Sequence, residues 1–137
     1  MASIFTRILT RELPGFIVWE DDDFAAILDI HPINPGHTLL IPKLDLGNVY
    51  DLPSALYSRL WETVRILEPA LKQIAEAKAI GILVQGLEVK HAHVHLVPLH
   101  TPDDLGRNDP PRASDADLAA MALRLRRAWL PLARRAS

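Results

Sequence analysis

The chain has 137 residues, a formal net charge of −2 at pH 7, 49% hydrophobic and 23% charged residues, and no cysteine. This length fits one domain, residues 1–137, with its own core; the charge balance argues against a general nucleic-acid binder, and the lack of cysteine excludes disulfides, thiolate zinc sites and a cysteine nucleophile. No apolar run reaches the roughly 18–20 residues of a membrane helix, and the first residues do not resemble a signal peptide, so a cytoplasmic location is the default expectation.

The first third of the chain predicts a short helix followed by three strands. Apolar residues at positions 4, 5, 8 and 9 are spaced for one or two helical turns, which Ser3 would cap. Residues 16–20 and 24–30 predict a hairpin around the acidic turn 21–23. A loop with two prolines and one glycine, residues 31–36, then leads to a third strand over residues 37–43.

The rest of the chain predicts one long helix, two strands and a last helix. An apolar stripe predicts a helix over residues 52–77, with Pro53 at its start, Asp51 as a cap and a kink or local break at Pro69 on the solvent side. Strands follow over residues 79–85 and from residue 91 to near Pro98, and a helix over residues 114–135 begins at Ser114. The class is α+β, with a five-stranded antiparallel sheet.

Half of the six histidines lie in the run His91-Ala92-His93-Val94-His95-Leu96-Val97. On a strand, side chains alternate between faces, so the three histidines would share one face at steps of roughly 7 Å. An ordinary interpretation is a polar sheet face with each ring in solvent or bonded to backbone. Three imidazoles side by side repel one another when protonated, which makes a functional site the better interpretation.

Two kinds of chemistry fit such a site. Histidines at i and i+2 on a strand often share a zinc ion, and Glu88, His31 or His37 would supply the remaining ligand. Alternatively, the middle imidazole acts as a nucleophile or base in acyl or phosphoryl transfer while its neighbours bind the developing charge. His37 and Lys43, at the two ends of one predicted strand, favour a phosphate pocket.

The histidine run resembles the defining motif of the histidine triad (HIT) family, in which histidines alternate with hydrophobic residues. The resemblance extends over residues 3–100 and includes Phe24-Ala25-Ala26-Ile27-Leu28-Asp29-Ile30 and Pro35-Gly36-His37-Thr38-Leu39-Leu40-Ile41-Pro42-Lys43. The last helix, residues 114–135, is not diagnostic. The resemblance implies a HIT-like fold and hydrolysis or transfer of nucleoside monophosphates, usually AMP, from phosphoramidates, dinucleoside polyphosphates or adenylated adducts.

The family's functional residues are carried over by position. His93 would be the nucleophile that forms a nucleotidyl-histidine intermediate, with its Nδ1–H donated to a nearby carbonyl, while His91, His95 and His37 would surround the phosphate. Asp29 matches the ribose-binding acid, and Phe24 and Ile30 match the apolar walls of the base pocket. Gln85 and Glu88 complete the expected nucleotide-binding set.

Two departures from the family pattern stand out. Many members carry Gly-Gln-Ser/Thr before the triad, whereas this chain has Gly86-Leu87-Glu88. Either Glu88 or Lys90 replaces the missing contacts, or these two residues form a salt bridge or a solvated turn. Some bacterial members bind a structural zinc through Cys-x-x-Cys, where this chain has Ser3 and Thr6.

The resulting expectation is an enzyme that acts on an AMP-type nucleotide without a catalytic cofactor or metal, as a homodimer, with no nucleic-acid or membrane partner. A nucleotide-binding module with little turnover and a His-ligated zinc enzyme are the alternatives.

Overall fold

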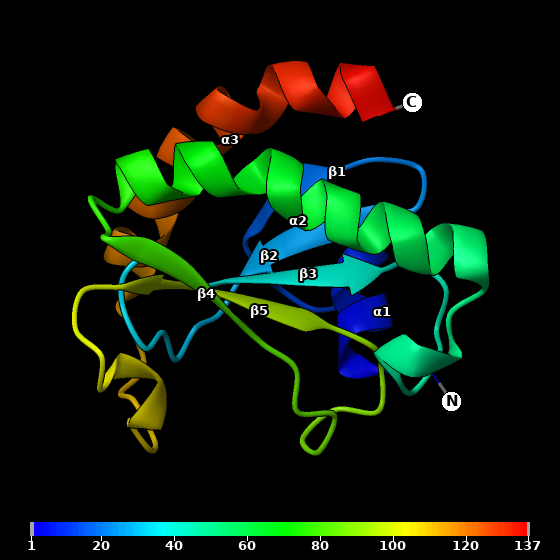
Figure 1. The fold of residues 1–137 in the computed structure, drawn as a ribbon, viewed down its shortest axis with the longest axis horizontal. Helices are drawn as coiled ribbons and strands as arrows, with labels where there is room; N and C mark the ends of the chain where they lie inside the picture. Colours follow the sequence, from blue (N-terminus) through cyan, green and yellow to red (C-terminus); the bar gives the residue numbers. More distant parts are fainter. Residues whose placement is uncertain (1, 137) are drawn as a thin grey trace.

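The computed structural model describes residues 2–136 as a five-stranded antiparallel sheet with three α-helices (Figure 1). The strands are β1 (Ile17–Glu20), β2 (Phe24–Leu28), β3 (Thr38–Pro42), β4 (Ala79–Leu83) and β5 (Val94–Leu99), and the α-helices are α1 (Ile4–Leu9), α2 (Ser54–Ile74) and α3 (Asp115–Ala136). The order across the sheet is β1-β2-β3-β5-β4. The predicted α+β class with one long helix between the third and fourth strands is confirmed. Within the described residues, no helix combines the length and apolar character needed to cross a bilayer.

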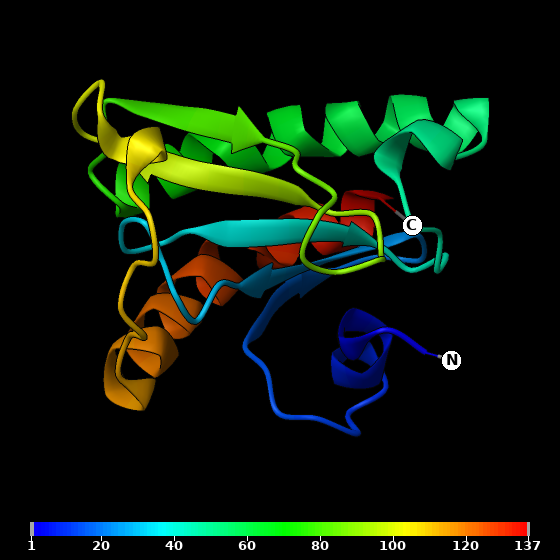
Figure 2. The same cartoon turned by 90° about the horizontal axis from the view of Figure 1, so that it is seen from below.

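The helices divide the sheet into a core face and a site face. α2 and α3 cover the core face, whereas α1 lies against the opposite, site face (Figures 1 and 2). The core face buries side chains that are at most 1% exposed, among them Phe24, Leu40, Leu60, Leu67, Val94 and Trp129. The site face carries a smaller apolar cluster of Phe5, Ile27, Leu39 and Ile41.

The helix starts agree with the prediction in two places and differ in one. The hydroxyls of Ser3 and Ser114 accept the first-turn N–H groups of α1 and α3, at 3.0 and 3.1 Å. Asp51 does not cap α2, because it lies in a short 3-10 helix, Val49–Asp51, and Pro53 takes the cap position without a side-chain bond. Within α2, Pro69 lies on the solvent side as predicted, and of the two expected effects, a kink or a local break, the break is wrong because the helix continues through this position.

The histidine run only partly forms a strand. β5 begins at Val94, and its pairing with β3 ends where Val94 meets Leu40. His91 and His93 therefore precede the strand, and the predicted row of three histidines on one strand face is wrong. The chain leaves the sheet here because residues 91–93 bond to other groups: the Ala92 N–H donates to the Leu46 carbonyl at 2.6 Å.

Candidate functional site

Three polar side chains meet on the site face because they share the parity of its apolar residues. His95 pairs with Leu39, which pairs with Ile27. Asp29 follows β2 two residues after Ile27, and His37 precedes β3 two residues before Leu39, so alternation sends both side chains to the same face. The backbone N–H of Asp29 donates to the carbonyl of His37 at 2.9 Å, which holds the two strand ends together.

A chain of hydrogen bonds fixes the proton positions on His37 and His95. The N–H of Ile33 donates to Nδ1 of His37 at 3.1 Å, so the neutral ring of His37 carries its proton on Nε2. This Nε2 lies 2.9 Å from Nδ1 of His95 and donates to it. The proton of His95 is then on Nε2, which leaves His95 with a free N–H donor.

Both rings are neutral at pH 7. Burial lowers the pKa of His37 to about 4, and burial together with the nearby His37 and His93 lowers the pKa of His95 to about 4. His37 Nε2 lies 3.5 Å from a carboxylate oxygen of Asp29, but a neutral ring forms no ion pair with it. Burial also raises the pKa of Asp29.

His93 presents a free nitrogen lone pair. Its Nδ1 lies 2.7 Å from the carbonyl oxygen of His91, and because a carbonyl only accepts, Nδ1 must carry the proton. The lone pair is then on Nε2. The predicted Nδ1–H bond to a nearby carbonyl is confirmed. The ring lies edge-on to those of Phe5 and His95, with centroids 5.0 and 5.1 Å away.

His91 does not surround a phosphate as the resemblance implied. Its side chain is fully buried, and Nε2 donates to the carbonyl of Pro42 at 2.7 Å. Nδ1 faces the hydroxyl of Ser3 at 2.5 Å. Both nitrogens are therefore occupied by protein groups, since residue 91 lies outside the strand and its ring turns between α1 and the end of β3.

A cavity of about 660 Å³ opens beside the His37–His95 pair, a volume typical of small-molecule sites. One wall carries Asp29, His37 and His95 together with Gln85 and Glu88, so the structure brings these predicted residues together. The opposite wall is the segment of residues 105–112. Lys43 lies elsewhere and pairs with Glu20 at 2.8 Å.

The second wall is firmly attached. The buried carboxylate of Asp104 accepts hydrogen bonds from His100 N, Thr101 N, Thr101 Oγ1 and Asn34 Nδ2 at 2.7 to 3.0 Å. These bonds hold the pKa of Asp104 well below its usual range. Further along, Arg107 donates to the Ile33 carbonyl at 2.6 Å, and the Nδ1–H of His31 donates to the Pro110 carbonyl at 3.2 Å.

Two predicted apolar site residues lie elsewhere. Phe24 is 1% exposed and packs on the core face, because it has the opposite parity to Ile27 along β2. Its assignment to a base pocket is therefore corrected. Ile30 is 38% exposed and is not among the residues that line the cavity; its carbonyl accepts the N–H of Ala113.

Two parts of the site were missed in the sequence. Phe5 packs against His93 from α1, and the helical pattern alone gave no sign that this helix covers the site face. Arg107 and the rest of residues 105–112 lie between the last predicted strand and the last predicted helix, where no site residue is predicted. Proline and charged residues in a connection are so common that no signal in the sequence distinguished this wall from any other loop.

One group of side chains has metal-ligand character. The donor atoms of Asp29, His37 and His95 lie within 4.8 Å of one another, and two imidazoles with a carboxylate suit several divalent metals. The hydrogen bond from Ile33 opposes this use, because it places the proton of His37 on the nitrogen that would bind the metal. A metal here therefore requires this bond to break.

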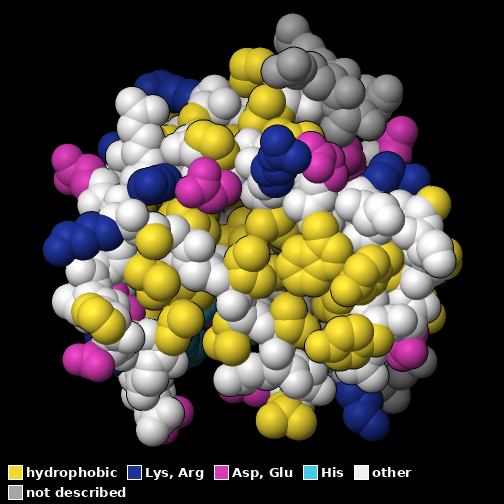
Figure 3. All heavy atoms as spheres, in the orientation of Figure 1, with side chains coloured by type: hydrophobic (Ala, Val, Ile, Leu, Met, Phe, Trp, Pro, Cys, Tyr) yellow, Lys and Arg dark blue, Asp and Glu magenta, His cyan; other side chains and the backbone are white. Residues whose placement is uncertain are grey.

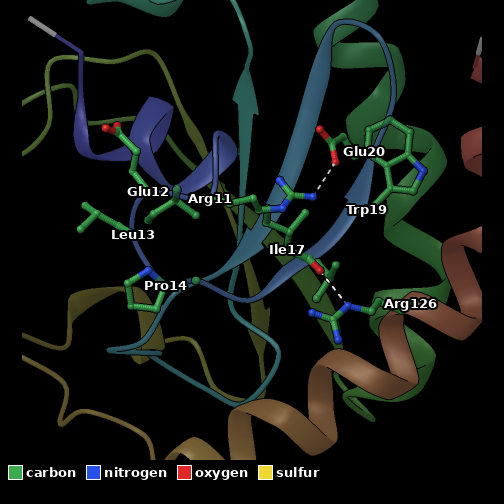
Figure 4. A pocket seen from close by; sticks show the side chains of 11 residues that line it. Arg11, Glu12, Leu13, Pro14, Ile17, Trp19, Glu20 and Arg126 are labelled. Carbon is green, nitrogen blue, oxygen red and sulfur yellow. Dashed lines mark hydrogen bonds and ion pairs between the residues drawn. The ribbon is translucent and has the colours of Figure 1, made fainter.

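A separate cavity of about 690 Å³ lies beside β1 and contains no histidine (Figure 4). Arg126 reaches over from α3 to donate to the Ile17 carbonyl at 2.8 Å, at a register shift in the β1–β2 pairing. Arg11 pairs with Glu20 at 3.6 Å. Arg126 and Arg11, the two arginines that line this cavity, are thus both bonded to β1. The cavity beside His37 and His95 remains the candidate site.

Comparisons with known proteins identify the family of the chain. Residues 10–101 match the family model described as HIT domain. An uncharacterized HIT-like protein of Borreliella burgdorferi is 34% identical over 75% of this chain and 79% of its own length. An adenylylsulfatase of Arabidopsis thaliana is 34% identical over 69% of each chain. The crystal structure of a hypothetical histidine triad nucleotide-binding protein of Sulfolobus tokodaii superposes with a TM-score of 0.83 at 28% identity, over 96% of this chain and 94% of its own.

Proposed function

The chain belongs to the HIT family, and we propose that it is a nucleotide hydrolase or transferase that cleaves at the α-phosphorus of a nucleoside 5′-phosphoramidate or a dinucleoside polyphosphate. The name of the Arabidopsis relative, an adenylylsulfatase, supports hydrolysis of an adenylylated compound as the reaction. The observation that carries the proposal is the proton pattern of two rings whose centroids lie 5.1 Å apart, in which His93 has its lone pair on Nε2 and His95 has its N–H donor on Nε2.

The first step is attack of His93 Nε2 on the α-phosphorus. A bond forms between nitrogen and phosphorus, the bond to the leaving group breaks, and its electron pair leaves with that group, which takes up a proton from solvent; the water that hydrolyses the intermediate returns one. Water then attacks the nucleotidyl-histidine, releases the nucleoside monophosphate and regenerates His93. The Nδ1–H bond to the His91 carbonyl keeps the correct tautomer and stabilises the imidazolium that forms.

The His37–His95 pair supplies a donor for the negative charge of the transition state. With its proton fixed on Nε2, His95 offers an N–H to a non-bridging phosphate oxygen, and donors arranged before the reaction contribute strongly to phosphoryl transfer. His37 holds the proton of His95 in place. Asp29 takes the ribose hydroxyls, and Gln85 and Glu88 complete the polar wall of the cavity.

We propose that none of these steps needs a metal or another cofactor. The support is the protonation pattern: His93 has the free lone pair of a nucleophile, and His37 has a proton where a metal ligand needs a lone pair. The zinc-enzyme alternative would require a different tautomer of His37.

The second candidate function is nucleotide binding with little turnover. Leu87, at the position of the family glutamine, is 86% exposed, and Glu88 is exposed as well, so neither side chain is fixed against the histidines. Binding of AMP by calorimetry without turnover of any adduct would favour this candidate.

The test is capture of the covalent intermediate. Wild-type protein mixed with an adenosine phosphoramidate and quenched in milliseconds should gain the mass of one AMP, and peptide mapping should place it on His93. His93→Ala should show neither the adduct nor AMP release, while a chelator should leave the wild-type rate unchanged. An unmodified wild type, or full activity in His93→Ala, contradicts the proposal.

We also propose that two copies pair through the β4 edge of the sheet. The outer side of β4 pairs with no strand within residues 2–136, and Ile82 on this strand and Ile66 on α2 are 49% and 43% exposed. Figure 3 shows hydrophobic side chains gathered on the face that carries α2 and β4. An unpaired edge beside exposed apolar residues suits antiparallel pairing with a second copy.

Light scattering after size-exclusion chromatography tests this pairing. Wild type should have about twice the chain mass of 15.3 kDa, and Ile82→Lys should have the single-chain mass with its fold retained. A single-chain mass for wild type at high micromolar concentration contradicts it.

A further inference from the structure

The hydroxyl of Ser3 has a partner beyond its own helix. As the cap of α1, Ser3 Oγ accepts the N–H of Thr6 at 3.0 Å. It also lies 2.5 Å from Nδ1 of His91, closer than its 3.3 Å distance to Thr6 Oγ1. Since the proton of His91 is on Nε2, facing the Pro42 carbonyl, Nδ1 is an acceptor and Ser3 O–H is the donor.

The ring of His91 consequently links two elements of the structure. One nitrogen is held by α1 through Ser3, and the other by the end of β3 through Pro42. The backbone here has little other support, because residues 91–93 precede the β5 ladder and the N–H of Ala92 is held by the single loop carbonyl of Leu46. The position of the His91 carbonyl thus depends on how its ring is held.

That carbonyl is the acceptor that orients His93 at 2.7 Å. We infer that Ser3 is a positioning residue for His93, acting through the ring and then the carbonyl of His91. The inference rests on the proposed function in taking His93 as the nucleophile. It adds a residue 90 positions away in sequence to the machinery of the reaction, without contact to substrate.

Among residues 2–136, no neighbouring group replaces the Ser3 donor. Thr6 Oγ1 lies 3.4 Å from Nδ1 of His91 but donates to the carboxylate of Asp45 at 3.0 Å. Asp45 itself lies 3.5 Å from Nδ1 and offers only acceptors. If His91 moved its proton to Nδ1 to meet Asp45, a lone pair would face the Pro42 carbonyl. The ring must then shift, and the His91 carbonyl shifts with it.

The variants separate capping of α1 from support of His91. Ser3→Ala loses both, whereas Ser3→Gly keeps most of the capping preference but has no hydroxyl. Ser3→Thr keeps both functions. Thr10→Ala is the matched control, since its hydroxyl donates to the Arg7 carbonyl at the other end of α1, away from His91.

Two measurements are made on each variant. Single-turnover kinetics with an adenosine phosphoramidate should show that nucleotidyl-histidine formation is about tenfold slower in Ser3→Ala and Ser3→Gly, with KM within twofold of wild type. Ser3→Thr and Thr10→Ala should match wild type. Two-bond ¹⁵N–¹H spectra should show a single Nδ1–H tautomer for His93 in wild type and a mixture in Ser3→Gly.

The spectra do not depend on turnover, so failure of the proposed function and failure of this inference are distinguishable. An inactive wild type with the expected tautomer change in Ser3→Gly supports the positioning role and contradicts only the reaction. A wild-type rate or an unchanged His93 tautomer in Ser3→Gly overturns the inference, and so does a rise in KM that accounts for the whole loss of efficiency.

Discussion

The His91–His93 segment and the His37–His95 pair contain the same residue type but are held in different ways. In the pair, His95 lies on β5 and His37 directly precedes the neighbouring β3, and both rings take their proton positions from the backbone N–H of Ile33. The segment lies outside the sheet and takes its proton positions from two carbonyls, those of Pro42 and His91. A ring nitrogen that faces an N–H group must accept, which puts the proton on the other nitrogen. A ring nitrogen that faces a carbonyl must donate, which leaves the lone pair on the other nitrogen.

Among substitutions that keep His93, replacing His95 should have the largest effect on turnover. His95→Phe keeps an aromatic ring of similar shape but removes the N–H donor, so kcat should fall about 10²–10³-fold while the melting temperature changes little. Steady-state kinetics with an adenosine phosphoramidate and thermal melting measure the two quantities. A kcat within a few-fold of wild type would show that His95 does not stabilise the transition state.

Replacing His91 should instead act mainly on stability. His91→Phe leaves the buried carbonyl of Pro42 without its donor, so unfolding free energy should fall by about 2–3 kcal/mol and kcat by about tenfold. Urea denaturation measures the loss, with Thr10→Ala as the control for α1. A fall in kcat for His91→Phe that equals or exceeds that for His95→Phe would contradict the view that His91 acts mainly on stability.

The neutral pair should make the fold sensitive to acid. The unfolded chain binds protons on these histidines at the ordinary pKa of 6.5, whereas the folded chain binds them near pH 4, so stability falls as pH drops from about 6.5 toward 4. Between pH 7 and pH 5.5 the two rings together should cost about 2 kcal/mol. Urea denaturation at both pH values should show about half this loss in His37→Gln and the full loss in the control His31→Gln. The same loss in both variants would contradict the assignment.

The smallest effect is expected at Glu88, which lines the cavity but is exposed and belongs to neither histidine region. Glu88→Gln should change kcat/KM by about threefold or less, because an exposed charge is well screened. Comparison of a phosphoramidate with a neutral leaving amine and a dinucleoside tetraphosphate would detect this change. A loss of tenfold or more would place Glu88 in direct contact with the reacting groups.

The sequence predicted the sheet well because hydrophobic periodicity and turn residues decide it. Each of the first three strands lies within its predicted range to two residues at either end. Once the strand register is known, the alternation of side chains along the strands also explains why Asp29, His37 and His95 lie together. The assignment of Phe24 to the base pocket was wrong because a resemblance identifies the segment, whereas only the strand register shows which face of the sheet a side chain occupies.

The role of His91 was beyond prediction for a different reason. Alternation with Ala92 and Val94 is the pattern of a strand, and nothing in it shows that the chain leaves the sheet before Val94. The departure is caused by bonds to Leu46, Pro42 and Ser3, which are distant in sequence. Tertiary contacts of this kind override local propensity and leave no periodic signal.

The attachment of Asp104 has a consequence for how this site can diversify. It fixes the start of residues 105–112, the segment that forms the outer wall of the cavity and lies beyond the part of the chain that matches the family model. The histidines of the cavity and residues 105–112 therefore come from separate parts of the sequence. Mutation or exchange of residues 105–112 can change the shape of the cavity while Asp104 and the sheet keep Asp29, His37 and His95 in place, so directed evolution of its specificity would begin with this segment.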